Sequence, residues 1–152
     1  MISDQNYFVV TIEDNTNLAL PTESVIGIYP CPKLFSLPFS PANILGIGVV
    51  AGQAVPVVNI TKKSLSIEVT AQKKPLLLIL KNKLERFGIL IDKVVGLKHF
   101  PNDRIKPVNP LENLPANLNL PGSIKSQKLQ VFENNGTTIW LLDPKEMVWV
   151  EV

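Results

Sequence analysis

The chain has 152 residues, of which 45% are hydrophobic and 18% are charged, and its 15 Lys and Arg side chains nearly balance its 13 Asp and Glu side chains. A chain of this length buries roughly 68–70% of its unfolded surface, which suffices for a hydrophobic core without disulfides or metals. We therefore expect one globular domain over residues 1–152, and we exclude a disordered protein and a basic nucleic-acid-binding surface.

The cysteine content and the N-terminal sequence bear on the compartment. Cys31 is the only cysteine, which excludes an internal disulfide and a metal site made of several cysteines, and it fits a reducing compartment. The opening residues MISDQNYFVV lack the basic start of a secretory signal, and no stretch approaches the ~18 apolar residues of a membrane helix. We expect a cytoplasmic protein without membrane insertion.

The first part of the chain predicts a hairpin followed by a bend. In Tyr7–Ile12, Phe8, Val10 and Ile12 alternate with the other three side chains, which predicts a strand with two different faces. Asn17–Leu20 can pair with this strand as a hairpin. Thr22 can cap a single helical turn that reaches Val25, and Gly27–Tyr29 resumes extended structure.

A proline-rich stretch and a second hairpin follow. YPCPKLFSLPFSP, at 29–41, holds four prolines, which excludes a central strand and predicts a fixed surface connection. SPANIL, at 40–45, predicts a short helical turn. Gly46–Val50 and Ala54–Asn59 predict the two strands of a hairpin that turns at Ala51-Gly52.

The next segment predicts three strands and a long excursion. Apolar runs with short polar breaks predict strands at Leu76–Leu80, Arg86–Ile91 and Val94–Phe100. Residues 104–122 are rich in proline and predict an irregular surface excursion, of a length that is usually functional or mobile.

A third hairpin is predicted near the C-terminus. Lys128–Phe132 and Thr137–Leu142 flank Asn135-Gly136, which is the strongest hairpin signal in the chain. A last helical turn is expected at Asp143-Pro144. Nine or ten short strands in this order predict an all-β domain of small barrels, and we find no sequence repeat of fixed period.

Three side chains are candidates for chemistry, namely Cys31, Asp92 and His99. The lone histidine excludes a metal site with two histidines, Cys31 has only Lys33 as a basic neighbour in sequence, and Asp92 has no identifiable second acid. We therefore expect no catalytic residue, no metal and no cofactor. A small-barrel enzyme or ligand binder that uses these three residues remains the alternative from a different functional class.

The order of features resembles the CheW-like domain, the coupling domain that bridges chemoreceptors and the histidine kinase CheA. The family signature Pro-x-x-Ile/Leu-x-Gly is matched by Pro41, Ile44 or Leu45, and Gly46, while the hairpin glycine and following proline are matched by Gly52 and Pro56. The segments NYFVVTIED, RFGILIDKVVGL, DRIKPVNP and TTIWLLDPKEM extend the resemblance over most of the chain.

The resemblance implies two small five-stranded SH3-like barrels that share a hydrophobic seam, with short helical turns. It also implies a non-enzymatic adaptor in a chemotaxis, phototaxis or type IV pilus motility pathway. In this family the cytoplasmic tip of a methyl-accepting chemoreceptor docks in the groove between the barrels. The regulatory domain of CheA, which has the same fold, contacts the hairpin ends.

Matched positions and surface considerations give the candidate binding residues. The receptor groove is expected to be lined by Val25, Ile28, Phe87 and Val95. The hairpin that faces the kinase is expected to include Gly46, Ala51, Gly52 and Gln53.

Three positions depart from the family pattern. Gly27 stands where an acidic residue is usual, Ala51 where an arginine is usual, and Asn59 where an aspartate is usual. Ala51 lacks the guanidinium that makes bidentate contacts, and Gly27 removes its possible counter-charge. The alternative within the family is therefore a divergent protein that self-associates or modifies arrays without binding a kinase.

Overall fold

The computed structural model describes residues 5–38, 44–60, 74–83, 85–108 and 129–146. These residues form twelve β-strands and four single 3-10 turns. The turns are Glu13–Asn15, Thr22–Ser24, Asn102–Arg104 and Pro144–Glu146. In this part of the chain we find no helix with the length and apolar character needed to cross a membrane.

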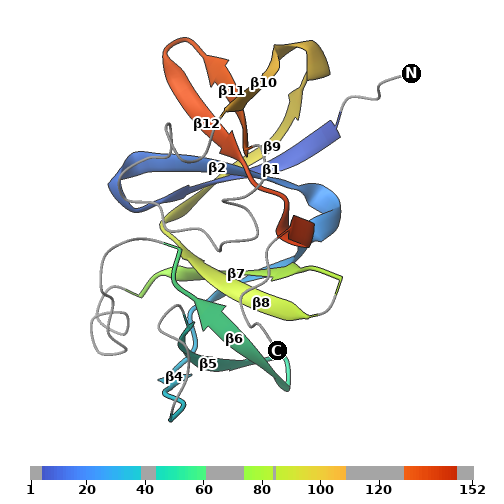
Figure 1. Ribbon diagram of the computed structural model, residues 1–152. Helices are drawn as coiled ribbons and strands as arrows, with labels where there is room; N and C mark the ends of the chain where they lie inside the picture. The colour runs from blue at the N-terminus through green and yellow to red at the C-terminus, as the bar shows by residue number, and fades with distance from the viewer. Residues whose placement is uncertain (1–4, 39–43, 61–73, 84, 109–128, 147–152) are drawn as a thin grey trace.

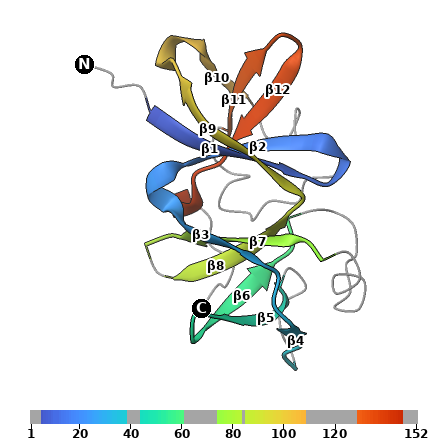
Figure 2. The same cartoon turned by 180° about the vertical axis from the view of Figure 1, so that it is seen from behind.

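The strands form two six-stranded sheets, which Figures 1 and 2 show one above the other. The first sheet contains, in spatial order, β10 (Ile105–Val108), β11 (Leu129–Asn134), β12 (Thr137–Leu141), β2 (Thr16–Pro21), β1 (Gln5–Ile12) and β9 (Lys93–Phe100). The second contains β3 (Val25–Pro30), β7 (Leu76–Lys81), β8 (Arg86–Ile91), β6 (Gln53–Val58), β5 (Ile44–Val50) and β4 (Leu34–Phe35).

Each sheet curls toward a barrel because its two edge strands are neighbours in the chain. In the first sheet the edge strands β9 and β10 are joined by the short bend at residues 101–104, and in the second the edge strands β3 and β4 are joined by residues 31–33. A short connection holds the two edges of a sheet close together, which nearly closes it. We call the first sheet barrel 1 and the second barrel 2.

The hydrophobic residues fall into three cores. One core lies between the barrels and takes side chains from both, including Val10 and Leu20 of barrel 1 and Leu78 and Phe87 of barrel 2. The two others belong to single barrels. The predicted all-β fold of two barrels that share a hydrophobic seam is therefore confirmed, but each sheet has six strands rather than the expected five. We call the shared core the seam core.

Strands between two cores are apolar on both faces, and this explains the longest apolar runs in the sequence. In β7, Leu78 and Leu80 point into the seam core while Leu77 and Ile79 point into the core of barrel 2. The alternation is the same in β1, where Val9 and Val10 reach different cores. Successive side chains of a strand point to opposite faces, so a run of apolar residues here fills two cores at once.

Most predicted strands are confirmed, and the exceptions have physical reasons. The prediction of an irregular excursion is wrong for residues 105–108, which form β10. This strand contains Pro107, and a proline is tolerated there because β10 is the edge of its sheet. Thr22 begins the 3-10 turn rather than capping it, since no side-chain hydrogen bond caps that turn. The helical turn expected at 40–45 and the rest of the excursion, 109–122, lie largely or wholly outside the described residues.

Candidate partner-binding surfaces

Strand β9 carries an exposed apolar ridge formed by Val94, Val95 and Leu97. Their side chains are 40%, 46% and 67% exposed. Such a group of aliphatic residues on the surface of one strand is costly in water and typical of a contact site. We call these three residues the β9 ridge.

A β-bulge shapes the β9 ridge. Val94 pairs with Val10 and Gly96 pairs with Val9, so Val95 is an extra residue without a partner on β1. Gly96 has a φ of 135°, in a region that favours glycine. An extra residue twists the strand and redirects its side chains. Here the bulge accompanies three apolar side chains that lie outside the core.

Only one of the four expected groove residues is on the surface. Val95 belongs to the β9 ridge, whereas Val25 and Ile28 are half-buried against the seam core. Phe87 is 0% exposed and lies in the seam core itself, so its side chain offers no surface to a partner. Val94 and Leu97 are exposed beside Val95 and were not among the expected residues, although the sequence VVGL, which contains the bulge glycine, was a usable signal for exposure.

A second apolar surface lies at the free end of barrel 2. Phe35 on β4, Leu37 after it and Val49 on β5 are 52%, 45% and 53% exposed. Phe35 pairs with Ile47 across the sheet, and the ammonium group of Lys33 lies 5.4 Å from the centre of the Phe35 ring. We call Phe35, Leu37 and Val49 the apolar tip.

The glycines of β5 allow β4 and the connection before it to pack closely against β5. A Cβ on Gly46 would lie 2.9 Å from the carbonyl oxygen of Phe35, and a Cβ on Gly48 would lie 2.9 Å from a ring carbon of Pro32. Gly46 is itself buried, so it does not reach the hairpin end where a partner contact was expected. Its role here is to let β4 pack against β5.

The β5–β6 hairpin turns at Ala51 and Gly52, which have φ values of 51° and 79°. Positive φ at both central residues is the geometry of a type I′ turn. Ala51, Gly52 and Gln53 are exposed, and the Arg86 guanidinium donates a hydrogen bond of 2.9 Å to Oε1 of Gln53. Although position 51 lacks an arginine, Arg86 on β8 thus supplies a guanidinium beside this hairpin.

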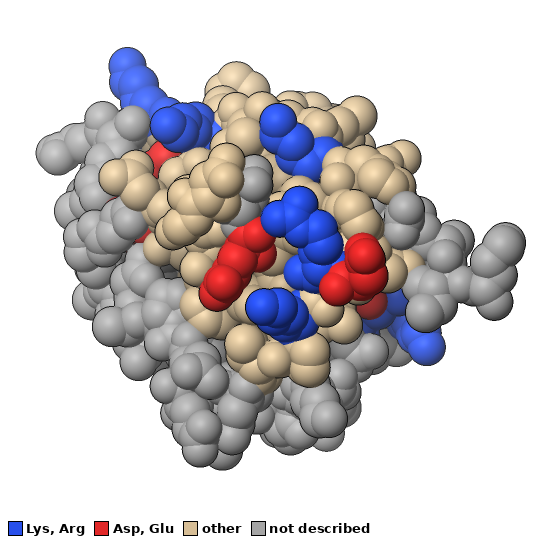
Figure 3. Space-filling model, turned by 90° about the horizontal axis from the view of Figure 1, so that it is seen from above, with Lys and Arg blue, Asp and Glu red and all other residues tan. Residues whose placement is uncertain are grey.

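The two free ends of the molecule differ in charge. The end of barrel 1 carries exposed side chains of both signs side by side, as Figure 3 shows, among them Asp103, Arg104, Lys106 and Glu133. In the described residues 25–37, 44–58, 76–83 and 85–91 of barrel 2, by contrast, Glu85 is the one acidic residue. The basic residues in these ranges are Lys33, Lys81, Lys83 and Arg86.

Comparison with known proteins places this fold in a family. A family model for the CheW-like domain matches residues 6–149. The chain belongs to the CheW-like domain family. Among the curated proteins, none matches this sequence.

A solved CheW-like structure shows the same fold. The scaffolding protein TtCheW from Thermoanaerobacter tengcongensis superposes with a TM-score of 0.67 at 14% sequence identity, over 93% of this chain and 85% of that chain. At this identity the likeness concerns the fold alone.

The departures from the CheW-like pattern have local structural settings. A Cβ on Gly27 would lie 2.9 Å from the ring of Tyr29, so an acidic residue could enter only if that ring moved. Ala51 is exposed at the turn and Asn59 is half-buried. Of these three positions, Ala51 is therefore the one that is exposed to a partner.

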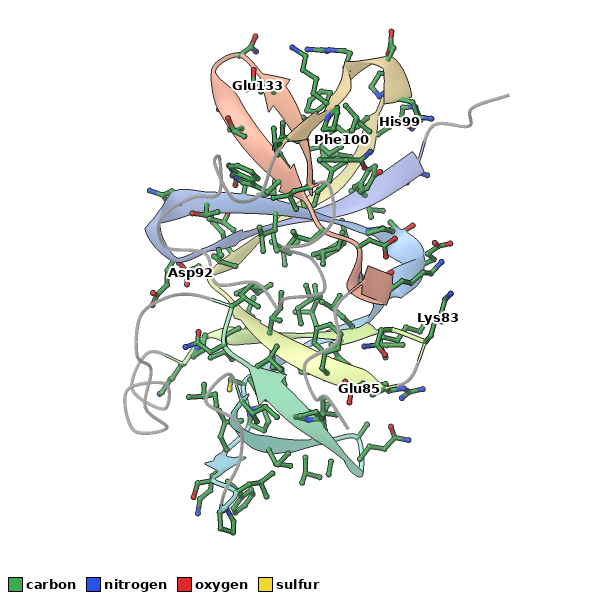
Figure 4. All side chains as sticks on the ribbon, viewed as in Figure 1. Lys83, Glu85, Asp92, His99, Phe100 and Glu133 are labelled. Carbon is green, nitrogen blue, oxygen red and sulfur yellow. The ribbon has the colours of Figure 1, made fainter. Side chains whose placement is uncertain are left out.

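The residues proposed for chemistry do not assemble. Asp92 and His99 lie at opposite ends of β9 (Figure 4), and Cys31 is in the connection that closes barrel 2. The Cys31 thiol donates a hydrogen bond of 3.4 Å to the Pro32 carbonyl, and burial raises its pKa, which opposes thiolate formation. Within the described ranges no three His, Cys, Asp or Glu residues are grouped as metal ligands would be.

Proposed function

We propose that this chain is a non-enzymatic adaptor that couples chemoreceptors to a CheA-type histidine kinase in a chemotaxis, phototaxis or type IV pilus motility pathway. Membership of the CheW-like family supports this function. The observation that carries it is the presence of two exposed apolar surfaces, one on each barrel, in a fold whose own cores are already filled. Such an adaptor works in the cytoplasm, recruited to receptor arrays.

The receptor side of the proposal concerns the β9 ridge. A chemoreceptor tip is a helical hairpin, and an apolar stripe on a helix can bury the exposed side chains of Val94, Val95 and Leu97. Val25 and Ile28 are half-buried against the seam core and Phe87 is buried in it, so Phe87 would act on a partner only through packing. Lys93 and Lys98 flank the ridge, which favours a receptor helix with acidic residues beside its apolar stripe.

The kinase side of the proposal concerns the end of barrel 2. There the regulatory domain of the CheA-like kinase would meet Ala51, Gly52 and Gln53 at the hairpin and the apolar tip beside it. Aromatic residues, phenylalanine among them, are enriched in protein–protein interfaces, so we expect Phe35 to be the centre of this contact. Gly46 contributes by permitting the close packing of β4, on which Phe35 is carried.

Binding experiments with the cognate partners test the proposal. Leu97→Asp is expected to weaken binding to the receptor hairpin at least roughly tenfold, since a carboxylate would replace the most exposed apolar side chain of the ridge. Gln130→Asp, at an exposed position of β11 outside the ridge, is the matched control for added negative charge. Absence of binding between the unchanged chain and all kinases and receptors of its own genome would contradict the adaptor function.

A second candidate is a divergent CheW-like protein that self-associates or modifies arrays without a kinase partner. The observation that favours it is Ala51, which presents a methyl group at the exposed hairpin where the family usually has an arginine. Dimers seen by light scattering, together with no measurable kinase binding, would support this candidate over the first.

A further inference from the structure

The chain runs through the same sequence of strands twice. β1–β6 form a hairpin followed by four strands, and β7–β12 form a hairpin followed by four strands. We call Gln5–Val58 unit 1 and Leu76–Leu141 unit 2. No fixed-period repeat is visible in the sequence, so this repetition is a property of the fold.

Each unit gives its hairpin to the other. The β1–β2 hairpin of unit 1 completes barrel 1, whose other strands are β9–β12 of unit 2. The β7–β8 hairpin of unit 2 completes barrel 2, whose other strands are β3–β6 of unit 1. Neither unit therefore contains a whole barrel, and each barrel is shared between both units.

The two barrels agree in detail. Both third strands of their units carry a bulge at a Val-Val/Ile-Gly sequence, at 25–27 against β7 and at 94–96 against β1. Both final hairpins turn on two residues of positive φ, Ala51-Gly52 and Asn135-Gly136. Both contain one parallel pair in the same place, β6 with β8 and β12 with β2. The units thus behave as two copies related by an approximate two-fold axis.

The contacts that join the units do not depend on the chain connection between them. The strand pairs that cross from one unit to the other are β1 with β9, β2 with β12, β3 with β7, and β6 with β8. The seam core adds buried residues from both units, such as Leu18 and Val58 from unit 1 and Leu80 and Ile89 from unit 2. All of these contacts would form equally between a unit 1 and a unit 2 of different copies.

One covalent segment, residues 59–75, joins the units. Fully extended, a segment of this length reaches about 60 Å. A folded chain of this size has a radius of gyration of about 15 Å. The segment is therefore long enough to pass from one folded barrel pair to a neighbouring one.

We propose that two copies of this chain associate by exchanging unit 2. The seam of each barrel pair then forms between unit 1 of one copy and unit 2 of the second copy. The product is a dimer that holds two complete barrel pairs, each made of unit 1 from one copy and unit 2 from the other. Such exchange keeps every native contact and changes only the path of the joining segment. Because hairpins are interlocked in both directions, exchange requires that the seam open.

Concentration decides which form dominates. Covalent linkage through a segment of this length gives the units of one chain an effective concentration on the order of 1 mM for each other. The closed single chain is thus expected at micromolar concentration, and the exchanged dimer becomes substantial near the millimolar range. The dimer would display two β9 ridges and two apolar tips, which favours simultaneous binding of two partners. The exchange itself does not rest on the proposed adaptor function.

Refolding two differently tagged copies together tests the exchange. The copies are unfolded in urea, mixed and refolded at about 1 mM and at about 10 µM, then purified through both tags in succession and measured by light scattering. We expect, only at the higher concentration, a folded species that carries both tags and has twice the 16.8 kDa mass of one chain. Recovery of monomers alone at both concentrations would overturn the proposal.

A variant of the joining segment provides a second, independent measurement. Deleting residues 61–73 joins Ile60 directly to Lys74, although β8 separates β6 from β7 by two strand spacings, about 10 Å. The deletion hinders closure within one chain and should give a dimer even at about 10 µM, whereas a Gly/Ser segment of unchanged length should leave a monomer. A folded monomer from the shortened chain would contradict the exchange. If the shortened chain does not fold, the refolding experiment with the two tagged, unchanged copies decides whether exchange occurs.

Discussion

The free ends of the two barrels have the same strand arrangement and opposite surface chemistry. Val49 and Glu133 each lie two residues before the final hairpin turn of their barrel. Phe35 and Lys106 each pair with the residue four positions before that turn. Barrel 1 folds with a carboxylate and an ammonium group at these positions, so the fold does not require the valine and phenylalanine of barrel 2. Under the proposed function, a partner that contacts the apolar tip explains their presence.

The interiors of the barrels, unlike their ends, should respond alike to substitution. Leu18 and Phe87 occupy equivalent places on β2 and β8, and both are fully buried in the seam core. Phe87→Ala is expected to lower the free energy of unfolding by about 3–5 kcal/mol and Leu18→Ala by about 2–5 kcal/mol, because each leaves a cavity. Urea denaturation measures both, and an unchanged stability of Phe87→Ala would show that Phe87 is a surface residue after all.

The two hairpin turns offer a reciprocal exchange of one residue. Ala51 and Asn135 have nearly the same φ, 51° and 52°, but asparagine tolerates this left-handed region better than alanine does. Ala51→Asn should raise the free energy of unfolding by about 0.5–1 kcal/mol, and Asn135→Ala should lower it by a similar amount. Thermal unfolding of both variants checks the pair, and equal signs would contradict the turn assignment.

A second substitution at Ala51 distinguishes an effect on stability from an effect on partner affinity. Ala51→Arg restores the residue usual in the family at an exposed position, so stability should change by no more than about 0.5 kcal/mol. If the hairpin meets a kinase domain, the affinity for that domain should change. A loss of stability without a change in affinity would place Ala51 outside any contact.

The smallest expected effect concerns Cys31 in the connection that closes barrel 2. Burial raises the pKa of its thiol in the folded chain, so the thiolate is more easily formed in the unfolded chain. At pH values below the pKa of this thiol in the unfolded chain, the free energy of unfolding should therefore be unaffected. It should fall slightly as the pH rises through and above that pKa. Iodoacetamide should alkylate Cys31 more slowly in the native chain than in urea at pH 8, as followed by mass spectrometry. Faster native alkylation would revive a reactive-cysteine function.

Local patterns predicted most of the strands but not their places at the edge or centre of a sheet. Asn135-Gly136 identified its hairpin because this pair has few other uses. β10 and β4 were missed because proline-rich segments rarely form strands, and only the complete sheet shows that both are edges. The repetition of the fold was hidden because equivalent positions, such as Val49 and Glu133, have unrelated side chains.

The candidate site was predicted only in part for a related reason. Val95, which is exposed, and Phe87, which is buried, were both predicted to line the groove, because an apolar residue at a strand end looks the same in sequence whether it faces a core or solvent. Phe87 is buried because the seam of two barrels covers it. Phe35 and Val49 were overlooked, since their exposure follows from the short β4 strand at the sheet edge rather than from their own sequence context.

The most direct test of partner binding by barrel 2 is to give its end the residue found in barrel 1. Affinity of Val49→Glu for the regulatory domain of the cognate CheA-type kinase should be at least roughly tenfold below that of the unchanged chain, about 1.4 kcal/mol. Its stability should be unchanged, since Val49 is 53% exposed, and the matched control Glu133→Gln should bind normally. Equal affinities of Val49→Glu and the unchanged chain for this domain would contradict the assignment of the apolar tip as the kinase contact.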